Sequence, residues 1–125
     1  MNYGFVKVAA AVPHVQVADC FYNIQQMEGL MRQASDKGVQ IIAFPEMSVT
    51  AYTCLDLFAQ QALLKNAEQA LLKLVSDTAD LNILTIAGAP LVTENRLINA
   101  AVAFQSGKIL GVVPKTYIPN YKEFQ

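Results

Sequence analysis

Apolar side chains recur along this chain in two ways, as short unbroken runs and as longer stretches with one apolar face. The runs within residues 5–12 and 39–44 are typical of β-strands covered on both faces in a parallel sheet. Between them, residues 19–37 carry apolar side chains at helical spacing, with Asp19 as an N-cap and Gly38 placed for a left-handed turn. The first part of the chain therefore predicts a strand–helix–strand unit with parallel strands.

The rest of the chain predicts one more amphipathic helix and three more strands. These elements are a helix over 60–79 and strands over 82–87, 97–104 and 108–113. We expect Gly88-Ala89-Pro90 to close the first of the three strands. Gln105-Ser106-Gly107 is expected to join the last two as a hairpin, with glycine at a position that needs positive φ. The order β-α-β-α-β-β-β indicates an α/β fold with a mixed sheet over residues 1–125.

Composition narrows the classes of protein that this chain can belong to. A hydrophobic content of 54% with 15% charged residues is typical of a packed domain, or of a piece of one, in 125 residues. The net charge of −1 indicates neither nucleic acid nor an anionic membrane surface as a partner. No apolar run approaches the roughly 18 residues of a membrane helix, and Pro13 interrupts the only stretch that resembles a signal peptide. With two cysteines and no disulfide framework, a cytoplasmic location is expected.

Two predicted strands end in a proline followed by a charged residue. Glu46 comes directly after Phe44-Pro45, and Lys115 comes directly after Val113-Pro114. Since proline cannot donate to a sheet ladder, each strand should stop there, at the edge where open α/β sheets form binding crevices. The two charges are then either an ordinary surface pair or a carboxylate base beside an ammonium that stabilises developing negative charge. Spacing alone leaves both interpretations open.

The motifs around these two residues resemble those of the nitrilase (carbon-nitrogen hydrolase) superfamily, which uses a Glu-Lys-Cys triad. The similarity is closer to one branch, the glutaminase domain of glutamine-dependent NAD synthetases, and it covers nearly the whole chain. It rests on residues 44–52, Asp56-Leu57-Phe58, Gly88-Ala89-Pro90 and residues 113–124. The resemblance implies a nitrilase-like α-β-β-α sandwich, of which these residues are the amino-terminal part.

The resemblance also implies a role for each of five residues. Glu46 matches the general base that takes the proton of a nucleophilic thiol, and Lys115 matches the lysine that helps to hold the oxyanion. Tyr121 matches a tyrosine that lines the glutamine pocket, and Tyr52 matches another near the site. Glu123 lies near the position where nitrilases often carry a second structural or catalytic glutamate.

No nucleophile is expected within these residues. In the family the cysteine follows a later strand, beyond the lysine motif, whereas the sequence stops at Gln125. Cys20 is interpreted as a packing residue, and Cys54 as structural because it lies in no strand-to-helix elbow. His14, the only histidine, is interpreted as a loop residue, and no metal site is predicted because no second ligand is spaced with it. We therefore expect the isolated chain to lack glutaminase activity.

Further partners and cofactors follow from the resemblance. Glutamine is the implied substrate, and the ammonia is expected to reach an ATP-using synthetase domain, absent from this sequence, that amidates nicotinic acid adenine dinucleotide to NAD. ATP and Mg²⁺ are expected there, and no cofactor is expected for the glutaminase part. Apolar surface left uncovered on half a domain predicts a homo-oligomer. Two other functions stay open: another nitrilase-branch enzyme, such as an aliphatic amidase or N-carbamoyl hydrolase, and a non-catalytic binding module on the same scaffold.

Overall fold

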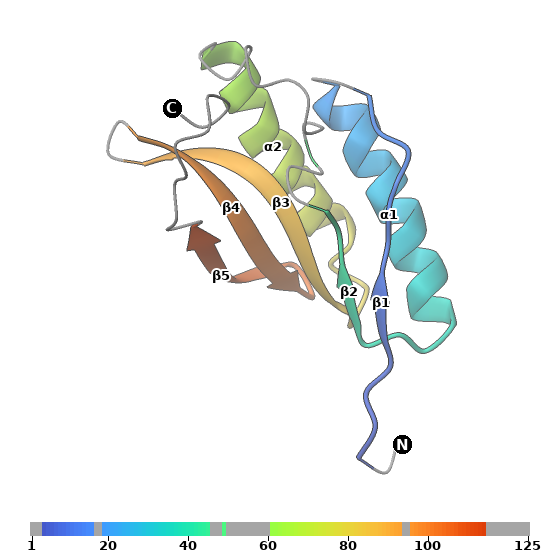
Figure 1. Cartoon of the computed structure of the whole chain (residues 1–125). Coiled ribbons are helices and arrows are strands. Elements are labelled where there is room, and N and C mark those ends of the chain that lie inside the picture. The colour runs from blue at the N-terminus through green and yellow to red at the C-terminus, as the bar shows by residue number, and fades with distance from the viewer. Residues whose placement is uncertain (1–3, 17–18, 46–48, 50–60, 94–95, 115–125) are drawn as a thin grey trace.

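The computed structural model of the chain describes residues 4–16, 19–45, 49, 61–93 and 96–114. Its elements follow the order β-α-β-α-β-β-β that the sequence predicts (Figure 1). The helices are α1 (Cys20–Asp36) and α2 (Gln61–Asp77). The strands are β1 (Val8–Ala10), β2 (Ile41–Ala43), β3 (Leu84–Thr93), β4 (Arg96–Gln105) and β5 (Lys108–Pro114).

The strands form one mixed sheet whose spatial order is the same as their order in the sequence, β1-β2-β3-β4-β5. β1, β2 and β3 are parallel, as the strand–helix–strand pattern predicts. β4 pairs antiparallel with β3, and β5 pairs antiparallel with β4. Because two reversals restore the direction, β5 runs the same way as β2, and both strands reach their carboxyl ends at the same edge of the sheet.

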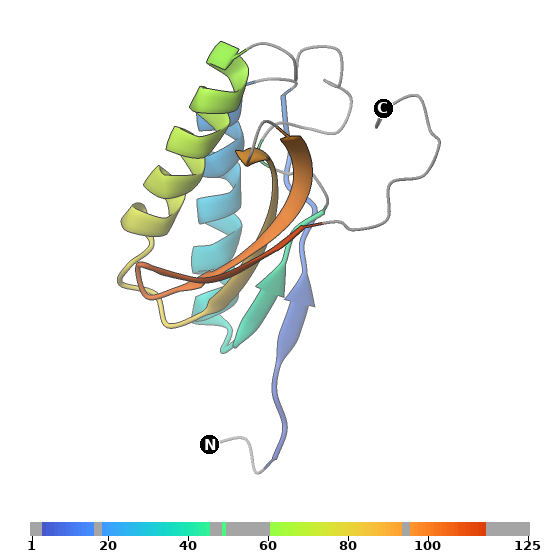
Figure 2. The same ribbon diagram turned by 90° about the vertical axis from the view of Figure 1, so that its left-hand side faces the viewer.

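Both helices lie on one face of the sheet (Figure 2). The core between them is made of apolar side chains from the helices and the central strands, and the largest that are fully buried are Phe104, Met27, Met31, Ile42 and Leu74. One helical layer and one sheet layer make half of the α-β-β-α sandwich that the resemblance implies. Within the described residues, neither helix is long and apolar enough to cross a membrane.

Local sequence signals fix the ends of α1 and of the last hairpin. The Asp19 carboxylate accepts a hydrogen bond of 3.2 Å from the Tyr22 N–H, so Asp19 is the N-cap that the sequence predicts. Gly38 ends the helix at a φ of 79°, a left-handed conformation that glycine adopts without strain. In the β4–β5 turn, Ser106 and Gly107 have φ values of 53° and 82°, as expected for a tight hairpin.

The expectation that Gly88-Ala89-Pro90 closes the third strand is wrong. β3 continues through these residues to Thr93, and Pro90 is paired in register with Asn99 of β4. The parallel neighbour β2 ends at Ala43, opposite Ile86, so beyond that point β4 is the only described strand that pairs with β3. A residue without an N–H is tolerated there because one side of the strand no longer needs a complete ladder.

The expectation that the parallel strands are covered on both faces is also wrong for the described residues. Ile42 is only 1% exposed beneath the helices, whereas its neighbours Ile41 and Ala43 are half-buried on the opposite face. The first strand is shorter than the predicted 5–12, and Val8 within it is 63% exposed. We call this helix-free side of the sheet the open face. Its exposure agrees with the prediction that half a domain leaves apolar sheet surface uncovered.

Candidate functional site

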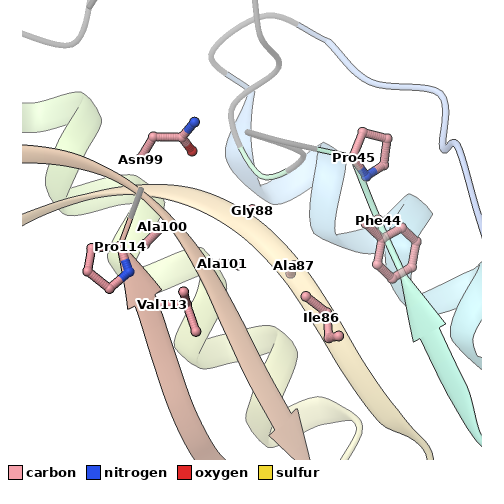
Figure 3. Close-up of a pocket in the computed structure, with 10 residues that line it drawn as sticks. All are labelled: Phe44, Pro45, Ile86, Ala87, Gly88, Asn99, Ala100, Ala101, Val113 and Pro114. Carbon is pink, nitrogen blue, oxygen red and sulfur yellow. The ribbon is translucent and has the colours of Figure 1, made fainter. Parts of the chain in front are cut away.

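A hollow of about 390 Å³ lies on the sheet where β2 and β5 reach their carboxyl ends (Figure 3). We call it the strand-end hollow. It is lined by Phe44, Pro45, Ile86, Ala87, Gly88, Asn99, Ala100, Ala101, Val113 and Pro114. Glycine and alanine supply much of the lining from β3 and β4, and their small side chains leave the space open. Asn99 has the only polar side chain among these ten residues.

The topology explains why two distant parts of the chain meet at this hollow. Pro45 follows β2 and Pro114 ends β5, and Figure 3 shows them on opposite sides of the β3 and β4 residues. In the sequence these prolines directly precede Glu46 and Lys115. The reasoning that both strands end at one edge of the sheet therefore holds for the two prolines.

The five site residues that the sequence proposes lie outside the described residues, and so does the loop cysteine. They are Glu46, Tyr52, Lys115, Tyr121, Glu123 and Cys54. Their roles stay predictions. The described residues that bear on the site are those at the ends of β2 and β5 and in the hollow between them.

The chain is hydrogen-bonded to β3 on both sides of Glu46. Before it, the Phe44 N–H donates to the Ile86 carbonyl at 2.9 Å. After it, the Val49 N–H donates to the Gly88 carbonyl at 3.1 Å, and Val49 is fully buried. The two acceptors are only two residues apart on β3, so Phe44 and Val49 contact β3 at neighbouring positions.

A buried asparagine on α1 also contacts Val49. The Asn23 Nδ2 donates to the carbonyls of Val49 and Gln16, both at 2.9 Å, and its Oδ1 accepts from the Gln16 N–H at 2.7 Å. Asn23 is 0% exposed, and these bonds join α1 to the segments that follow β1 and β2. Sequence reasoning missed this residue, although an asparagine within the apolar stripe of a helix is a signal for a buried polar contact.

His14 and Cys20 lie in the kinds of position that the sequence predicts. His14 is an exposed residue of the irregular segment after β1. Cys20 is 2% exposed at the start of α1 and belongs to the hydrophobic core. Among the described residues, no three side chains of histidine, cysteine, aspartate or glutamate gather as metal ligands would.

The ion pairs of the described residues lie away from the strand-end hollow. Arg32 of α1 contacts both carboxylate oxygens of Asp80, at 2.9 and 3.2 Å, and also reaches Glu28 at 3.0 Å. The hydrogen bonds from Arg32 lower the pKa of Asp80, and the bonds to Asp80 and Glu28 raise the pKa of Arg32. α1 ends just before β2 and Asp80 lies just before β3, so this network marks the opposite, amino-terminal edge of the parallel strands.

Comparison with known proteins identifies the family of the chain. A family model described as carbon-nitrogen hydrolase matches residues 7–125. The chain belongs to this family. The match confirms the resemblance on which the sequence-based expectations rest, and it spans both the β2 and the β5 strand ends.

This carbon-nitrogen hydrolase sequence is similar to the beginning of longer enzymes. It is 40% identical over 123 residues to the glutamine-dependent NAD(+) synthetase of Mycobacterium tuberculosis, a match that covers 98% of this chain and 18% of that protein. It is 32% identical over 108 residues to the protein of the same name from Aquifex aeolicus, covering 86% of this chain and 19% of that protein. The chain thus spans a small part of the length of the curated relatives it matches.

Solved structures confirm the nitrilase-like fold. A glutamine-dependent NAD(+) synthetase from Cytophaga hutchinsonii matches 92% of the chain with a TM-score of 0.84 and 21% identity, over 20% of its own length. A synthetase of the same name from Acinetobacter baumannii matches 90% with a TM-score of 0.71 and 30% identity, over 21% of its length. An amidase from Nesterenkonia sp. matches 94% with a TM-score of 0.77 and 18% identity, over 45% of its length. The matches to the Cytophaga and Nesterenkonia proteins show the shared fold alone.

Proposed function

We propose that this chain is the amino-terminal part of a glutaminase domain, which releases ammonia from the side-chain amide of glutamine. The observation that carries the proposal is the strand-end hollow, whose rim residues Pro45 and Pro114 directly precede Glu46 and Lys115 in the sequence. The 40% identity to a glutamine-dependent NAD(+) synthetase over 98% of the chain supports glutamine as the substrate.

In the proposed reaction Glu46 is the general base and Lys115 stabilises negative charge. The Glu46 carboxylate takes the proton of a cysteine thiol, and the thiolate attacks the amide carbon of glutamine. The ammonium of Lys115 stabilises the oxyanion that forms. Protonation of the leaving nitrogen by Glu46 releases ammonia and leaves a thioester, which water then hydrolyses to glutamate while the thiol regains its proton.

Three further residues are proposed to form the substrate pocket. Tyr52 and Tyr121 are assigned to contacts with glutamine, and Glu123 is assigned a structural or catalytic role beside them. Their assignment rests on the family resemblance of the motifs around Glu46 and Lys115. The hollow itself is largely apolar, so it suits the aliphatic part of a small substrate better than a charged group.

The nucleophilic cysteine and the synthetase activity are assigned to the remainder of a longer protein. The relatives in which this sequence matches only 18% to 19% of the length support that division. ATP and Mg²⁺ would serve the synthetase reaction, in which the ammonia amidates nicotinic acid adenine dinucleotide, and the glutaminase part would need no cofactor. A cytoplasmic location stays a prediction.

The proposal is tested on the continuous reading frame that contains this chain. Glutamate release from glutamine is measured for the encoded protein and for its Glu46→Gln and Lys115→Met variants. We expect turnover to fall by about 10²–10⁴-fold without the base and by about 10²–10³-fold without the ammonium. Glu68→Gln and Lys65→Met, two exposed positions of α2, are the matched controls and should keep full activity.

Other outcomes of this assay identify the competing functions. Hydrolysis of short aliphatic amides or N-carbamoyl compounds in preference to glutamine would indicate another branch of the family. A reading frame that contains no later cysteine, together with glutamine binding and no turnover, would indicate a binding module. Full activity of the Glu46→Gln or Lys115→Met protein would overturn the assigned roles.

The isolated 125-residue chain gives a second test. Because the proposed nucleophile lies outside it, we expect no glutamate release by this chain alone. Turnover that persists in Cys54→Ala would contradict this expectation, since it would require a nucleophile that the proposal does not contain.

A further inference from the structure

Asn99 carries a hydrogen-bond donor without a partner. Its Nδ2 is inaccessible to water and makes no hydrogen bond. A polar group in that state costs free energy, because folding removes its bond to water and nothing replaces it. Such a group needs an explanation, and a role in ligand binding is one.

The alternation of side chains along β4 places Asn99 on the open face. Ala100 and Val102 are 2% and 1% exposed, so their side chains belong to the face that the helices cover. Because successive side chains of a strand point to opposite faces, Asn99 and Ala101 lie on the open face. Asn99 lines the strand-end hollow, and Figure 3 shows its side chain extending from β4 toward the side where Pro45 lies.

The surroundings of this carboxamide are apolar and uncharged. Ala101 pairs in register with Val113 of β5, and both residues line the hollow beside Asn99. Of the ten described residues that line the hollow, none has a charged side chain. An ionised group placed there would lose its hydration without gaining an opposite charge from these ten residues, whereas a neutral group would lose much less.

We propose that Asn99 selects an uncharged primary amide over the corresponding carboxylate at the strand-end hollow. Its Nδ2 donates a hydrogen bond to the carbonyl oxygen of the ligand, and its Oδ1 accepts one from the ligand NH₂ group. The inference rests on the proposed function, in which glutamine is the substrate and glutamate the product. It adds the residue that distinguishes these two molecules by the group at the end of their side chains.

The hydrogen-bonding capacities of the two ligand groups differ in the way that this selection requires. A carboxamide has donors and an acceptor, so two carboxamides can pair through two hydrogen bonds. An ionised carboxylate has only acceptors, so it could engage the Nδ2 but would place its second oxygen against the Asn99 Oδ1. Low local polarity strengthens both the attraction and the repulsion. Asn99 should therefore favour binding of the substrate and release of the product.

The Asn99 carboxamide can turn toward a ligand with little loss of free energy. The terminal torsion of an asparagine side chain is broad, so both ends of the group can reorient. Because the Nδ2 has no partner, the turn breaks no hydrogen bond of that donor. The volume of the hollow, about 390 Å³, also lies within the range of about 300–1,000 Å³ that is typical of small-molecule sites.

The selection is first tested by ligand binding to the 125-residue chain, without enzyme activity. ¹⁵N NMR follows the side-chain amide signal of Asn99, which Asn99→Leu identifies by its loss. Propionamide reproduces the side chain of glutamine and should give saturable shifts of this signal at millimolar concentrations, whereas propionate should give none. The amide signal of Asn66, which is exposed on α2, is the internal control and should not move. Equal shifts with the amide and the acid, or no shift with the amide, would overturn the proposal.

The same selectivity is then measured by kinetics in the longer protein. Asn99→Leu should weaken glutamine binding, measured by KM, by about tenfold through loss of the hydrogen bonds. It should not weaken inhibition by glutamate, because the carboxylate gains little from Asn99. Asn66→Leu is the matched control and should retain both constants. Loss of affinity for glutamine and glutamate by the same factor would indicate a structural role and overturn the proposal.

Thermal unfolding and total activity separate the remaining outcomes. Replacing an unpartnered buried amide by an apolar side chain of similar size is close to neutral, so Asn99→Leu should keep the wild-type Tm. A fall in Tm with unchanged selectivity would also overturn the proposal. A wild-type protein that hydrolyses no amide would refute the proposed function, and the NMR titration would still decide this inference.

Discussion

Asn23 uses one buried side chain to make hydrogen bonds to two separate loops. Its three hydrogen bonds join backbone groups of Gln16 and Val49, which lie in different loops. The Val49 carbonyl belongs to a residue that is 0% exposed, as is Asn23, whereas the Gln16 carbonyl also accepts from the Asp19 N–H at 3.1 Å. The side chain therefore fixes loop backbone rather than adding to the apolar core.

We predict that Asn23→Ala lowers the free energy of unfolding by about 1–3 kcal/mol, because it removes the hydrogen bond from the Asn23 side chain to the carbonyl of the buried Val49. Urea denaturation followed by circular dichroism measures the change. Asn66→Ala is the matched control, since Asn66 is exposed on α2 and its loss should change stability by less than about 0.5 kcal/mol. Equal stability of the two variants would show that the Asn23 bonds contribute nothing.

At this scale the sequence predicted the helix cap and the left-handed glycine but not the buried Asn23. Asp19 and Gly38 act within a few residues of their own positions, so local spacing reveals them. Asn23 binds backbone groups of Gln16 and Val49, which lie outside its helix. Its role depends on which loops lie opposite, and apolar periodicity carries no information on that.

Among the elements, the β4–β5 hairpin depends on a glycine for two separate reasons. Gly107 has a φ of 82°, and a Cβ added to it would lie 2.9 Å from the Cβ of Ala79. The turn therefore packs closely against the chain just beyond α2. No residue with a side chain meets both requirements without strain.

Gly107→Ala should lower the free energy of unfolding by about 1–2 kcal/mol, the usual cost of a left-handed conformation at a residue with a Cβ. Gly111→Ala is its control on β5, because a Cβ there meets no atom within 4 Å. Chemical denaturation of the two variants measures the difference. A smaller loss for Gly107→Ala than for Gly111→Ala would contradict the proposed constraint.

The contact of Arg32 with Asp80 links α1 to the segment after α2 and should make stability depend on pH. Arg32 lowers the pKa of Asp80 below its ordinary 3.8 in the folded state. Folding is therefore favoured above that value, and the contribution is lost as the pH falls through the lowered pKa.

We predict that Arg32→Met lowers Tm at pH 7 and that its difference from the wild type shrinks as the pH falls below 3.8. Thermal unfolding at a series of pH values, with Lys65→Met as the surface control, measures this. A difference that stays constant down to about pH 2 would show that the Asp80 carboxylate is not the partner responsible.

At the scale of the whole molecule, the open face is the main departure from a closed domain. Phe5 and Val8 are 78% and 63% exposed near one edge of the sheet, and Val113 is 66% exposed near the other. Exposed apolar patches of this kind usually mark surfaces that another protein segment covers. Self-association of the chain stays a prediction on this basis.

Val8→Lys should reduce self-association, because a charge on the open edge strand opposes pairing between copies. Sedimentation velocity over a range of concentrations measures the change. Leu72→Lys adds the same charge at an exposed position of α2 and should have no effect, since Leu72 is on the helical side. A wild-type chain that is monomeric at all concentrations would contradict the prediction.

The sequence predicted the order of the elements but not which surfaces they cover. The strand–helix–strand pattern and the Ser106-Gly107 turn identify the parallel and antiparallel parts because each depends on neighbouring residues. The continuation of β3 through Pro90 was missed, since it depends on where β2 ends and on pairing with Asn99. The exposure of Val8 was missed because an apolar run looks the same whether its second face is covered or open.

The sheet order β1-β2-β3-β4-β5 bears on how the protein is made. Each strand pairs with the one synthesised just before it, so every new strand emerging from the ribosome finds its partner already in place. Pairings between nearby segments close short loops and form quickly. This layer can thus assemble from its amino-terminal end while synthesis continues. When strands are added in this order, β5 lies at one edge of the sheet. The next segment of a longer polypeptide can pair with that edge.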